Sequence, residues 1–531
     1  MSPTRSIETT APGAGPASPF PFRRVLALTC VVKVALAAIV PLTGDEAYFA
    51  LWGMYPDFGY YDHPPMIGWW LWAMLLGGNS VFLVRVPAIL TTVAAALIVR
   101  GVLRTIDRDK ADLVATLLLL TPFHVAGIVS TTDTPLVFFS VVSAAFAWRA
   151  GVRGSARDAL LAGLFLGAAF LSKYFAVLLG LAYAVYFPSV RRSWRGLGPV
   201  ALIFVGSLPG IAINAWWNYE HGWTNIMFNL FNRHGNAGFS LINPAAFLAL
   251  TAYWLGPGMV WVLFAQRREI AAGLGDRWRE AQQNGTAVFF AGALVPAATF
   301  FALSWVKNVG FHWLMSFYPL FFVVVFGVCS GQTVRRMMKP TAWFSAVHVV
   351  VVVVFLSLPL EKVVPARLYD SVLLATEPEV VMEALAPRLV ESELASGSYA
   401  KAAMLEFVTG KRIPVLGAGS FNGRHDDVLT DFRELEGRNF VILETRESRA
   451  AAGLGWFREA SLERLDVGGT TYKLLVGRGF DYQAYRADVL QRVADRYYDI
   501  PGWLKAAMKE SFFLVRYGLE SRGEDGEERG R

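Results

Sequence analysis

The sequence predicts an α-helical polytopic membrane protein with a C-terminal soluble α/β domain, and three observations carry this prediction. The 531 residues are 54% hydrophobic and only 17% charged, whereas a soluble domain usually has about a quarter charged residues. Apolar stretches suited to cross a membrane recur between residues 25 and 360. After residue 360 the chain becomes mixed and charged, with strand-like pieces such as "NFVILET" and "YKLLVG" between helical patterns.

About eleven apolar stretches are predicted to be transmembrane helices. Residues 159–189 are short for two crossings, but one long helix would invert every later basic cluster, so we predict a short helical hairpin there. The predicted spans lie at residues 25–42, 80–103, 112–129, 134–150, 159–172, 174–189, 197–217, 244–266, 287–305, 311–330 and 341–360.

Clusters of Lys and Arg between these stretches predict the orientation of the chain. They begin at Arg23 and Arg24, recur near residues 104, 153, 192, 268 and 336, and all fall on one side. Because short cytoplasmic loops carry the excess of Lys and Arg, the N-terminus is predicted to be cytoplasmic. The net charge of +7 comes from these clusters, so the sequence argues against a nucleic-acid partner.

Changes in composition divide the chain into four parts. Residues 1–22 are predicted to be a disordered cytoplasmic terminus, and residues 23–360 a membrane domain with a large outer loop at 43–79. Residues 361–517 are expected to form the α/β domain on the outer side, followed by a disordered tail at 518–531.

Ionisable side chains gather on the predicted outer side, many within a residue or two of an apolar stretch. Such groups are costly at membrane depth and are by default a functional-site hypothesis. The candidates are Asp45, Glu46, Asp62, His63, Asp133, Lys173, His221, Arg233, His234, Lys307 and His312.

Several of these residues belong to motifs that resemble a known family. The motifs are "GDEAYFALW", "GYYDHPPMIGWW", "STTDTPL", "FLSKYFAVLL", "PGIAINAWWNYEHGW" and "FHWLMSFYPL". Together they resemble the bacterial branch of the protein O-mannosyltransferases, which includes the lipid A aminoarabinose transferases and the lipopolysaccharide galacturonosyltransferases of the glycosyltransferase C superfamily. The resemblance covers roughly residues 25–330 and implies a glycosyltransferase C fold.

The resemblance also implies an activity and a location. It implies an enzyme of the bacterial inner membrane that takes a sugar from a polyprenyl phosphate on the outer, periplasmic face. The sugar passes, with inversion, to lipid A, lipopolysaccharide core, another glycan or a protein. This chemistry needs a base for the acceptor and cationic help for the departing phosphate.

By this resemblance the catalytic residues are Asp45, Glu46 and Asp133. Asp45 would be the base or orient the acceptor, Glu46 would support it, and Asp133 would be a second acidic group facing the cavity. The alternative for Asp45 and Asp133 is a helix N-cap, a position that Asp favours.

Substrate contacts are predicted for His63, for Lys173 and for aromatic side chains near them. Lys173 would bind the donor phosphate, and Arg233 is the alternative for that role. His63 departs from the resemblance, because the aminoarabinose transferases have lysine there. Lys173 could instead extend to the membrane interface. The aromatic candidates would stack on sugar or prenyl, or anchor the protein at the interface; they are Tyr48, Tyr61 and Trp223.

A divalent cation near the phosphate is a further expectation, with Asp62, His221 and His234 as its ligands. Carboxylate and neutral imidazole are common metal ligands. The alternative is that "DHPP" is a turn in which Asp62 bonds backbone amides.

Two other classes of function remain open from the sequence. A polytopic transporter or flippase would also place charges among membrane helices, although no inverted repeat is visible. A non-catalytic protein that binds a lipid-linked sugar would have the same predicted fold, and Asp45 would be dispensable in it.

Overall fold

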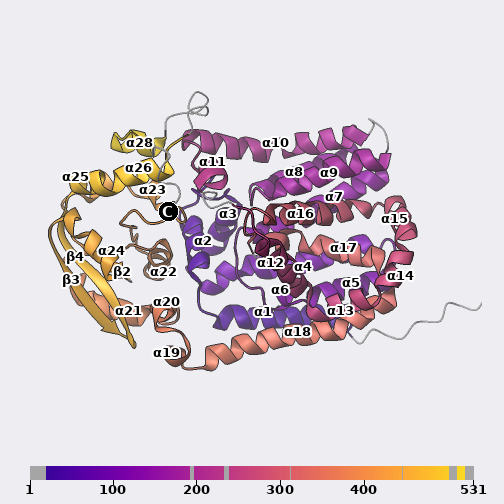
Figure 1. Ribbon diagram of the computed structural model, residues 1–531, viewed down its shortest axis with the longest axis horizontal. Coiled ribbons are helices and arrows are strands. Elements are labelled where there is room, and N and C mark those ends of the chain that lie inside the picture. Colours follow the sequence, from indigo (N-terminus) through magenta and orange to yellow (C-terminus); the bar gives the residue numbers. More distant parts are fainter. Residues whose placement is uncertain are drawn as a thin grey trace, which may run out of the picture.

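The computed structural model describes residues 20–191, 196–232, 238–310, 312–444, 446–500 and 511–520. A large helical region fills the right of Figure 1, and a smaller region with a β-sheet lies on its left. Residues Arg233 and His234, two of the predicted site residues, lie outside the described residues.

The helical region is built from eighteen labelled α-helices and short π and 3₁₀ turns within the described residues. Their bounds are α1 (Phe22–Ile39), α2 (Gly44–Met54), α3 (Met66–Leu75), α4 (Val81–Leu103), α5 (Arg108–Leu119), α6 (Pro122–Ala126), α7 (Asp133–Arg153), α8 (Ala156–Phe170), α9 (Ala176–Arg191), α10 (Leu197–Glu220), α11 (Thr224–Met227), η2 (Phe228–Asn232), α12 (Ile242–Leu255), α13 (Pro257–Ala265), α14 (Arg267–Ala272), α15 (Leu274–Gln283), α16 (Ala287–Ser304), η3 (Trp313–Phe317), α17 (Tyr318–Val328) and α18 (Gly331–Ser357).

Five described helices are long and apolar enough to cross a membrane: α4, α7, α10, α16 and α18. The number rises to seven if two bent pairs each count as one span. These pairs are α1 with α2, bent by 89°, and α12 with α13, bent by 97°. The membrane-protein class is therefore supported, while eleven crossings remain a prediction.

Each predicted span nevertheless contains described helical structure, and the differences have local causes. The stretch 112–129 is split between α5 and α6, and α6 starts at Pro122. Proline suits the first position of a helix but not its interior. The stretch 244–266 breaks at Gly256, whose φ of 86° L-residues rarely adopt.

The hairpin predicted at residues 159–189 is present as two separate helices, α8 and α9. α8 also packs against α10 along a line of small residues. A Cβ on Gly163 would meet the Ile203 carbonyl oxygen at 2.1 Å, and one on Gly210 would meet the Gly167 oxygen at 2.5 Å. Glycine therefore allows these two helix backbones to approach closely, as in other membrane helix pairs.

The second region continues the chain after α18 and contains a four-stranded sheet. Its strand order is β1-β2-β4-β3, in which β1 and β2 are parallel and the other neighbours antiparallel. The predicted pieces "NFVILET" and "YKLLVG" contain β2 and part of β4, whereas the exact domain boundaries remain a prediction. The bounds are α19 (Leu360–Val363), α20 (Ala366–Thr376), α21 (Pro378–Leu385), η4 (Ala386–Arg388), β1 (Glu393–Ser396), α22 (Tyr399–Thr409), α23 (Asp426–Leu429), η5 (Phe432–Leu435), β2 (Phe440–Glu444), α24 (Glu447–Ala452), η6 (Leu454–Trp456), β3 (Phe457–Val467), β4 (Thr470–Phe480), α25 (Tyr482–Tyr485), η7 (Arg486–Leu490), α26 (Gln491–Tyr497) and α28 (Phe512–Tyr517).

The two regions share a hydrophobic core where α2 packs against α22 (Figure 1). Buried Trp52 and Tyr60 of the helical region belong to the same cluster as Leu405 and Phe407 of α22. Trp52 and Tyr60 stack with ring centroids 4.3 Å apart. This packing holds residues 43–79 of the helical region against the α/β region, and the candidate site lies at that junction.

Candidate active site

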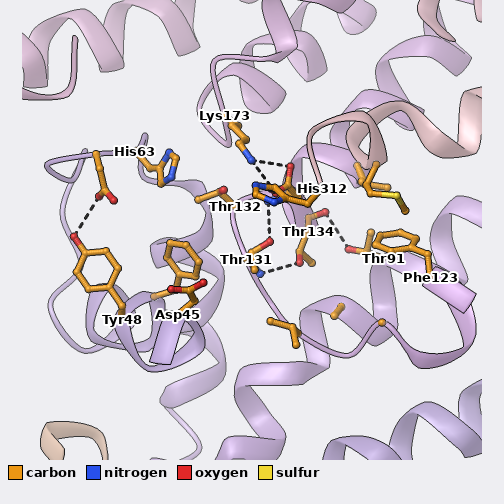
Figure 2. Close-up of a pocket in the computed structure, with 18 of the residues that line it drawn as sticks. Asp45, Tyr48, His63, Thr91, Phe123, Thr131, Thr132, Thr134, Lys173 and His312 are labelled. Atoms are coloured by element: carbon orange, nitrogen blue, oxygen red, sulfur yellow. Dashed lines mark hydrogen bonds and ion pairs between the residues drawn. The ribbon is translucent and has the colours of Figure 1, made fainter. Parts of the chain in front are cut away.

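A cavity of about 560 Å³ lies between the two regions (Figure 2). Most of its wall comes from α2, the loop after it, α4, α6 and the segment from α6 to the start of α7. Polar groups that converge in one cavity make it the default hypothesis for an active site. The ionisable side chains in the wall are Asp45, Asp62, His63, His124, Asp133, Lys173 and His312.

Asp45 lies in the first turn of α2, and its side chain is exposed to this cavity. The N-cap of α2 is Thr43, whose hydroxyl accepts from the Glu46 amide at 3.2 Å. Asp45 is therefore not the cap. Within the described residues no hydrogen bond or ion pair holds its carboxylate, which leaves it available to a ligand.

Glu46 is not in the described wall of the cavity, and its contacts argue against its predicted catalytic role. It is fully buried, and Arg85 binds its two oxygens at 2.9 Å each. The same carboxylate accepts from the Thr43 amide at 3.1 Å, which completes a capping box. Arg85 also donates to the Pro41 carbonyl at 2.7 Å. Glu46 therefore joins α1, α2 and α4 and has a structural role.

Asp133, by contrast, lies in the cavity wall and is already paired. Lys173 Nζ is 2.8 Å and 3.0 Å from its two oxygens. Ser316 Oγ donates to Asp133 Oδ1 at 2.9 Å, and His312 Nε2 lies 3.9 Å from Oδ2. Thr132 occupies the N-cap position of α7, so Asp133 does not cap it. Asp133 instead fixes the lysine, the serine and the histidine at one wall.

Asp62, Tyr48 and His63 lie in the same wall as Asp45. The Tyr48 hydroxyl donates to Asp62 Oδ1 at 3.3 Å. In the view of Figure 2, Asp45, Tyr48 and His63 lie on one side of the cavity, and Lys173 and His312 on the other. Each side of the cavity therefore has at least one carboxylate together with a lysine or histidine. This arrangement suits a substrate that has both a hydroxyl and a phosphate.

Besides Glu46, three predicted residues are outside the described wall of the cavity. The Tyr61 ring is buried near Phe228 and Tyr498. His221 stacks on Trp217 with centroids 4.1 Å apart. Trp223 precedes α11 with a φ of 60°, a left-handed conformation rare for a large residue. Tyr61 and His221 make ring contacts with Tyr498 and Phe512 of the α/β region, and none of the three residues lines the described cavity.

The predicted metal ligands are not assembled among the described residues. Asp62 lines the cavity whereas His221 does not, and His234 lies outside the described residues. The described part of the chain holds no group of three or more His, Cys, Asp or Glu side chains that could bind a metal ion.

A buried lysine next to the cavity wall was not predicted from the sequence. Lys33 is 1% exposed in α1, and its ammonium donates to Thr92 Oγ1 at 2.9 Å and to the Gly127 carbonyl oxygen. Thr92 and Gly127 both line the cavity. The signal was a lysine within an apolar stretch, which is costly without a role.

The contribution of the α/β region was also missed, and no sequence pattern indicates it. Tyr399, Asn422 and Gly423 complete the cavity wall from that region. The Tyr399 ring packs on Tyr48 with centroids 5.0 Å apart. Burial, followed by the negative charges of Asp45 and Asp62, raises the pKa of Tyr399 to about 12, so its hydroxyl stays protonated and can donate.

The fold of this chain is similar to that of a membrane protein whose structure has been solved, ArnT. The structure of ArnT from Cupriavidus metallidurans in the apo state matches with a TM-score of 0.61 at 13% identity, over 85% of this chain and 97% of that chain. The structure of the same protein bound to undecaprenyl phosphate matches with a TM-score of 0.58 at 14% identity over the same shares. At these identities the likeness shows the fold alone. It supports the helical membrane fold, whereas the eleven spans and the extent of the C-terminal domain stay predictions.

Comparison of sequences confirms the predicted resemblance. Residues 62–217 match the family described as dolichyl-phosphate-mannose-protein mannosyltransferase. The lipid A galacturonosyltransferase RgtD of Rhizobium johnstonii is 30% identical over 240 residues, 42% of this chain and 49% of that protein. Undecaprenyl phosphate-alpha-4-amino-4-deoxy-L-arabinose arabinosyl transferase of Edwardsiella ictaluri is 30% identical over 217 residues, 37% of this chain and 39% of that protein. The matches span less than half the length of these relatives.

Proposed function

We propose that this chain is a membrane glycosyltransferase that moves a sugar from a polyprenyl phosphate to an acceptor glycolipid. The observation that carries the proposal is the different state of two carboxylates in one cavity. Asp45 is exposed to the cavity and unpaired within the described residues, whereas Asp133 is paired with Lys173 at 2.8 Å. An open carboxylate suits a base, and a paired one suits the positioning of a cation.

The proposed reaction is a single displacement with inversion. Asp45 accepts the proton of the acceptor hydroxyl, whose oxygen attacks the anomeric carbon of the donor sugar. The bond from that carbon to the phosphate oxygen breaks, and its electron pair leaves with the polyprenyl phosphate. The phosphate gains one negative charge, which Lys173 and His63 stabilise from the cavity wall. Arg233 remains a candidate for the same role.

An apolar cavity next to the main one supports a polyprenyl donor. It measures about 110 Å³ and is lined mostly by hydrophobic side chains of α12, α16 and α17. Trp254 and Met315 belong to the walls of both cavities. A prenyl chain in the apolar cavity would leave its phosphate in the main one, where the cationic groups lie.

The relatives suggest the substrates. Because their names give lipid A and undecaprenyl phosphate, we propose undecaprenyl phosphate as the lipid of the donor and lipid A as the acceptor. Lipopolysaccharide core, another glycan and a protein remain alternative acceptors. The relatives reported above are transferases, so they give the transporter alternative no support.

The placement in the membrane is also part of the proposal. The positive-inside pattern supports a cavity that opens on the periplasmic side of the inner membrane. Eleven crossings would bring residues 361–517 to that same side, next to the cavity that Tyr399 helps to line. The junction between the two regions would then face the outer leaflet, where a lipid-linked donor and a glycolipid acceptor meet.

A divalent cation stays a proposal of its own, and no step of the reaction above needs it. Asp62 is the one predicted ligand that lies in the described cavity wall. Loss of activity in EDTA that Mg²⁺ or Zn²⁺ restores in the wild type but not in Asp62→Asn would support a metal site. Activity insensitive to EDTA would remove it.

Mass spectrometry of envelope lipids tests the function. The strains would carry the intact gene, a deletion, or the deletion complemented with wild type or Asp45→Asn. We expect one sugar mass to disappear from lipid A in the deletion, to return with the wild type and to stay absent with Asp45→Asn. An unchanged lipid and glycan profile in the deletion would contradict the proposal.

A further inference from the structure

A second cavity lies in the α/β region, next to the main one. It measures about 150 Å³ and is formed largely by the glycine-rich loop 417–423 and the residues after β1. Tyr399, Asn422 and Gly423 line both cavities. The two spaces therefore lie on either side of the same three residues, and a ligand in one is next to the other.

The shared wall is fixed by a close contact between Gly423 and Tyr399. Gly423 has a φ of 69°, and a Cβ added to it would meet the Tyr399 ring at 2.1 Å. Only glycine therefore fits here without moving the tyrosine. The ring is held from the other side by its contact with Tyr48.

The loop that covers the second cavity is anchored to both regions of the protein. His425 Nδ1 accepts from the Tyr61 amide of the helical region at 3.4 Å. Arg424 donates to both oxygens of Asp427 at 2.6 Å and to the Ala418 carbonyl at 2.7 Å. These contacts pre-organise the cavity, which lowers the entropy cost of binding.

Among the described residues that line the second cavity, one cation has no hydrogen-bonded or ion-paired partner. Arg424 and Asp427 pair with each other, and Asp426 pairs with Arg412 outside the cavity. Arg449 of α24 also lines the cavity and is exposed. Within the described residues no hydrogen bond or ion pair holds its guanidinium. The cavity thus offers a free group that binds phosphate in a bidentate manner.

The size of the second cavity indicates how large a ligand it takes. Pockets for drug-sized ligands measure roughly 300–1,000 Å³, so about 150 Å³ suits a single sugar ring. Its wall includes four glycines and the polar side chains of Ser398, Ser420 and Asn422, in addition to the charged side chains of Arg424, Asp426, Asp427 and Arg449. Backbone amides, hydroxyls and an amide side chain are the groups that hydrogen-bond sugar hydroxyls.

We propose that this cavity is the acceptor subsite, and that it holds one phosphorylated sugar unit of the acceptor with the phosphate on Arg449. The inference rests on the proposed function and deepens it, because it gives the α/β region the task of selecting the acceptor. The acceptor glycan then passes Tyr399 and Asn422 into the main cavity, where its reacting hydroxyl meets Asp45.

Transfer kinetics test the subsite in the full-length protein in lipid nanodiscs. Arg449→Gln removes the free cation, and Arg446→Gln is the matched control, because Arg446 is an exposed arginine directly before the same helix and is not in the described cavity wall. With purified lipid A as acceptor, we expect Arg449→Gln to raise its KM roughly 10- to 100-fold, as expected for one lost charge-assisted hydrogen bond. The kcat and the affinity for undecaprenyl phosphate should not change. Lipid A freed of its phosphates should bring the wild type to the KM of Arg449→Gln.

A binding measurement keeps this inference separate from the proposed function. Saturation-transfer NMR with glucosamine 1-phosphate needs no turnover, so it decides on the subsite even if the chain transfers no sugar to lipid A. We expect signals with the wild type and Arg446→Gln, and about tenfold weaker binding with Arg449→Gln, in line with one lost charge-assisted hydrogen bond. Equal binding by all three proteins, or an equal effect of both substitutions on KM, would overturn the acceptor subsite. Failure of the wild type to bind undecaprenyl phosphate would count against the proposed function instead.

Discussion

The ammonium of Lys173 lies 2.8 Å from Asp133 Oδ2, where the turn between α8 and α9 meets the start of α7. Both side chains are nearly buried, with 6% and 12% exposure. A buried charge that loses its partner costs far more than the pair itself gains. This pair therefore holds a cation in the cavity wall, whereas Asp45 has no ion pair within the described residues, as the proposed base requires.

Substitutions of Asp133 and Lys173 should affect stability in a non-additive way. We expect Asp133→Asn and Lys173→Met each to lower stability by about 3–5 kcal/mol, because each leaves the other charge buried and unpaired. The double variant should lose less than the sum of the two, and all three should lose transfer. Thermal unfolding in detergent measures this double-mutant cycle. Additive losses would mean that the two residues act independently.

Glu46 should affect stability and not turnover. We expect Glu46→Gln to lower stability by about 3–5 kcal/mol, because it leaves Arg85 charged and buried without its partner. The protein that stays folded should keep the wild-type kcat, since Glu46 does not line the described cavity. Thermal unfolding and activity per folded molecule separate the two effects. A large loss of kcat at unchanged stability would restore Glu46 to the catalytic residues.

Lys33 should contribute to binding of the donor lipid and not to the stability of the fold. Among the described residues no carboxylate pairs with it, so Lys33→Met removes an uncompensated buried charge and should leave thermal stability equal or higher. The same change removes a cation below the cavity and should weaken binding of undecaprenyl phosphate roughly tenfold, about 1.4 kcal/mol. Titration with undecaprenyl phosphate measures this effect. Unchanged affinity together with lower stability would make Lys33 purely structural.

His425 should make the junction of the two regions sensitive to acid. Burial, followed by the charges of Arg412 and His221, lowers the pKa of His425 to about 3. Between that pH and an unfolded pKa of about 6.5 the unfolded chain binds a proton that the folded chain does not. Stability should therefore be complete above pH 6.5 and fall by up to about 1.4 kcal/mol per pH unit below it. Thermal unfolding at pH 7, 6 and 5 checks this, and His425→Phe should flatten the dependence.

Much of the helical region and several site residues can be predicted from sequence, for physical reasons. Apolar stretches must form helices to satisfy their backbone in a membrane, and charges next to such stretches stand out. Asp45, Asp62, His63, Asp133 and Lys173 were found in this way, and they lie together in one cavity. Whether they perform the chemistry stays a prediction.

The structural role of Glu46 and the buried Lys33 could have been predicted from the sequence, whereas the contribution of the α/β region to the cavity could not. The spacing of Thr43 and Glu46 is that of a capping box, and this pattern would have indicated a structural Glu46. Lys33 was visible as a charge in an apolar stretch. The place of Tyr399 and Gly423 in the wall comes from packing between regions that are more than 300 residues apart, as the bond between Tyr61 and His425 shows. Local sequence has no trace of such a contact.

The measurement that tests the account most directly is sugar transfer by purified Asp45→Asn. Asp109→Asn is the matched control, because Asp109 is also exposed in the first turn of a helix, α5, but is not in the described cavity wall. Loss of a general base should lower kcat by about 10²–10⁴-fold, while folding and undecaprenyl phosphate affinity stay as in the wild type and Asp109→Asn stays active. Wild-type kcat in Asp45→Asn would contradict the assignment of the base, and with it the account of this cavity as the active site.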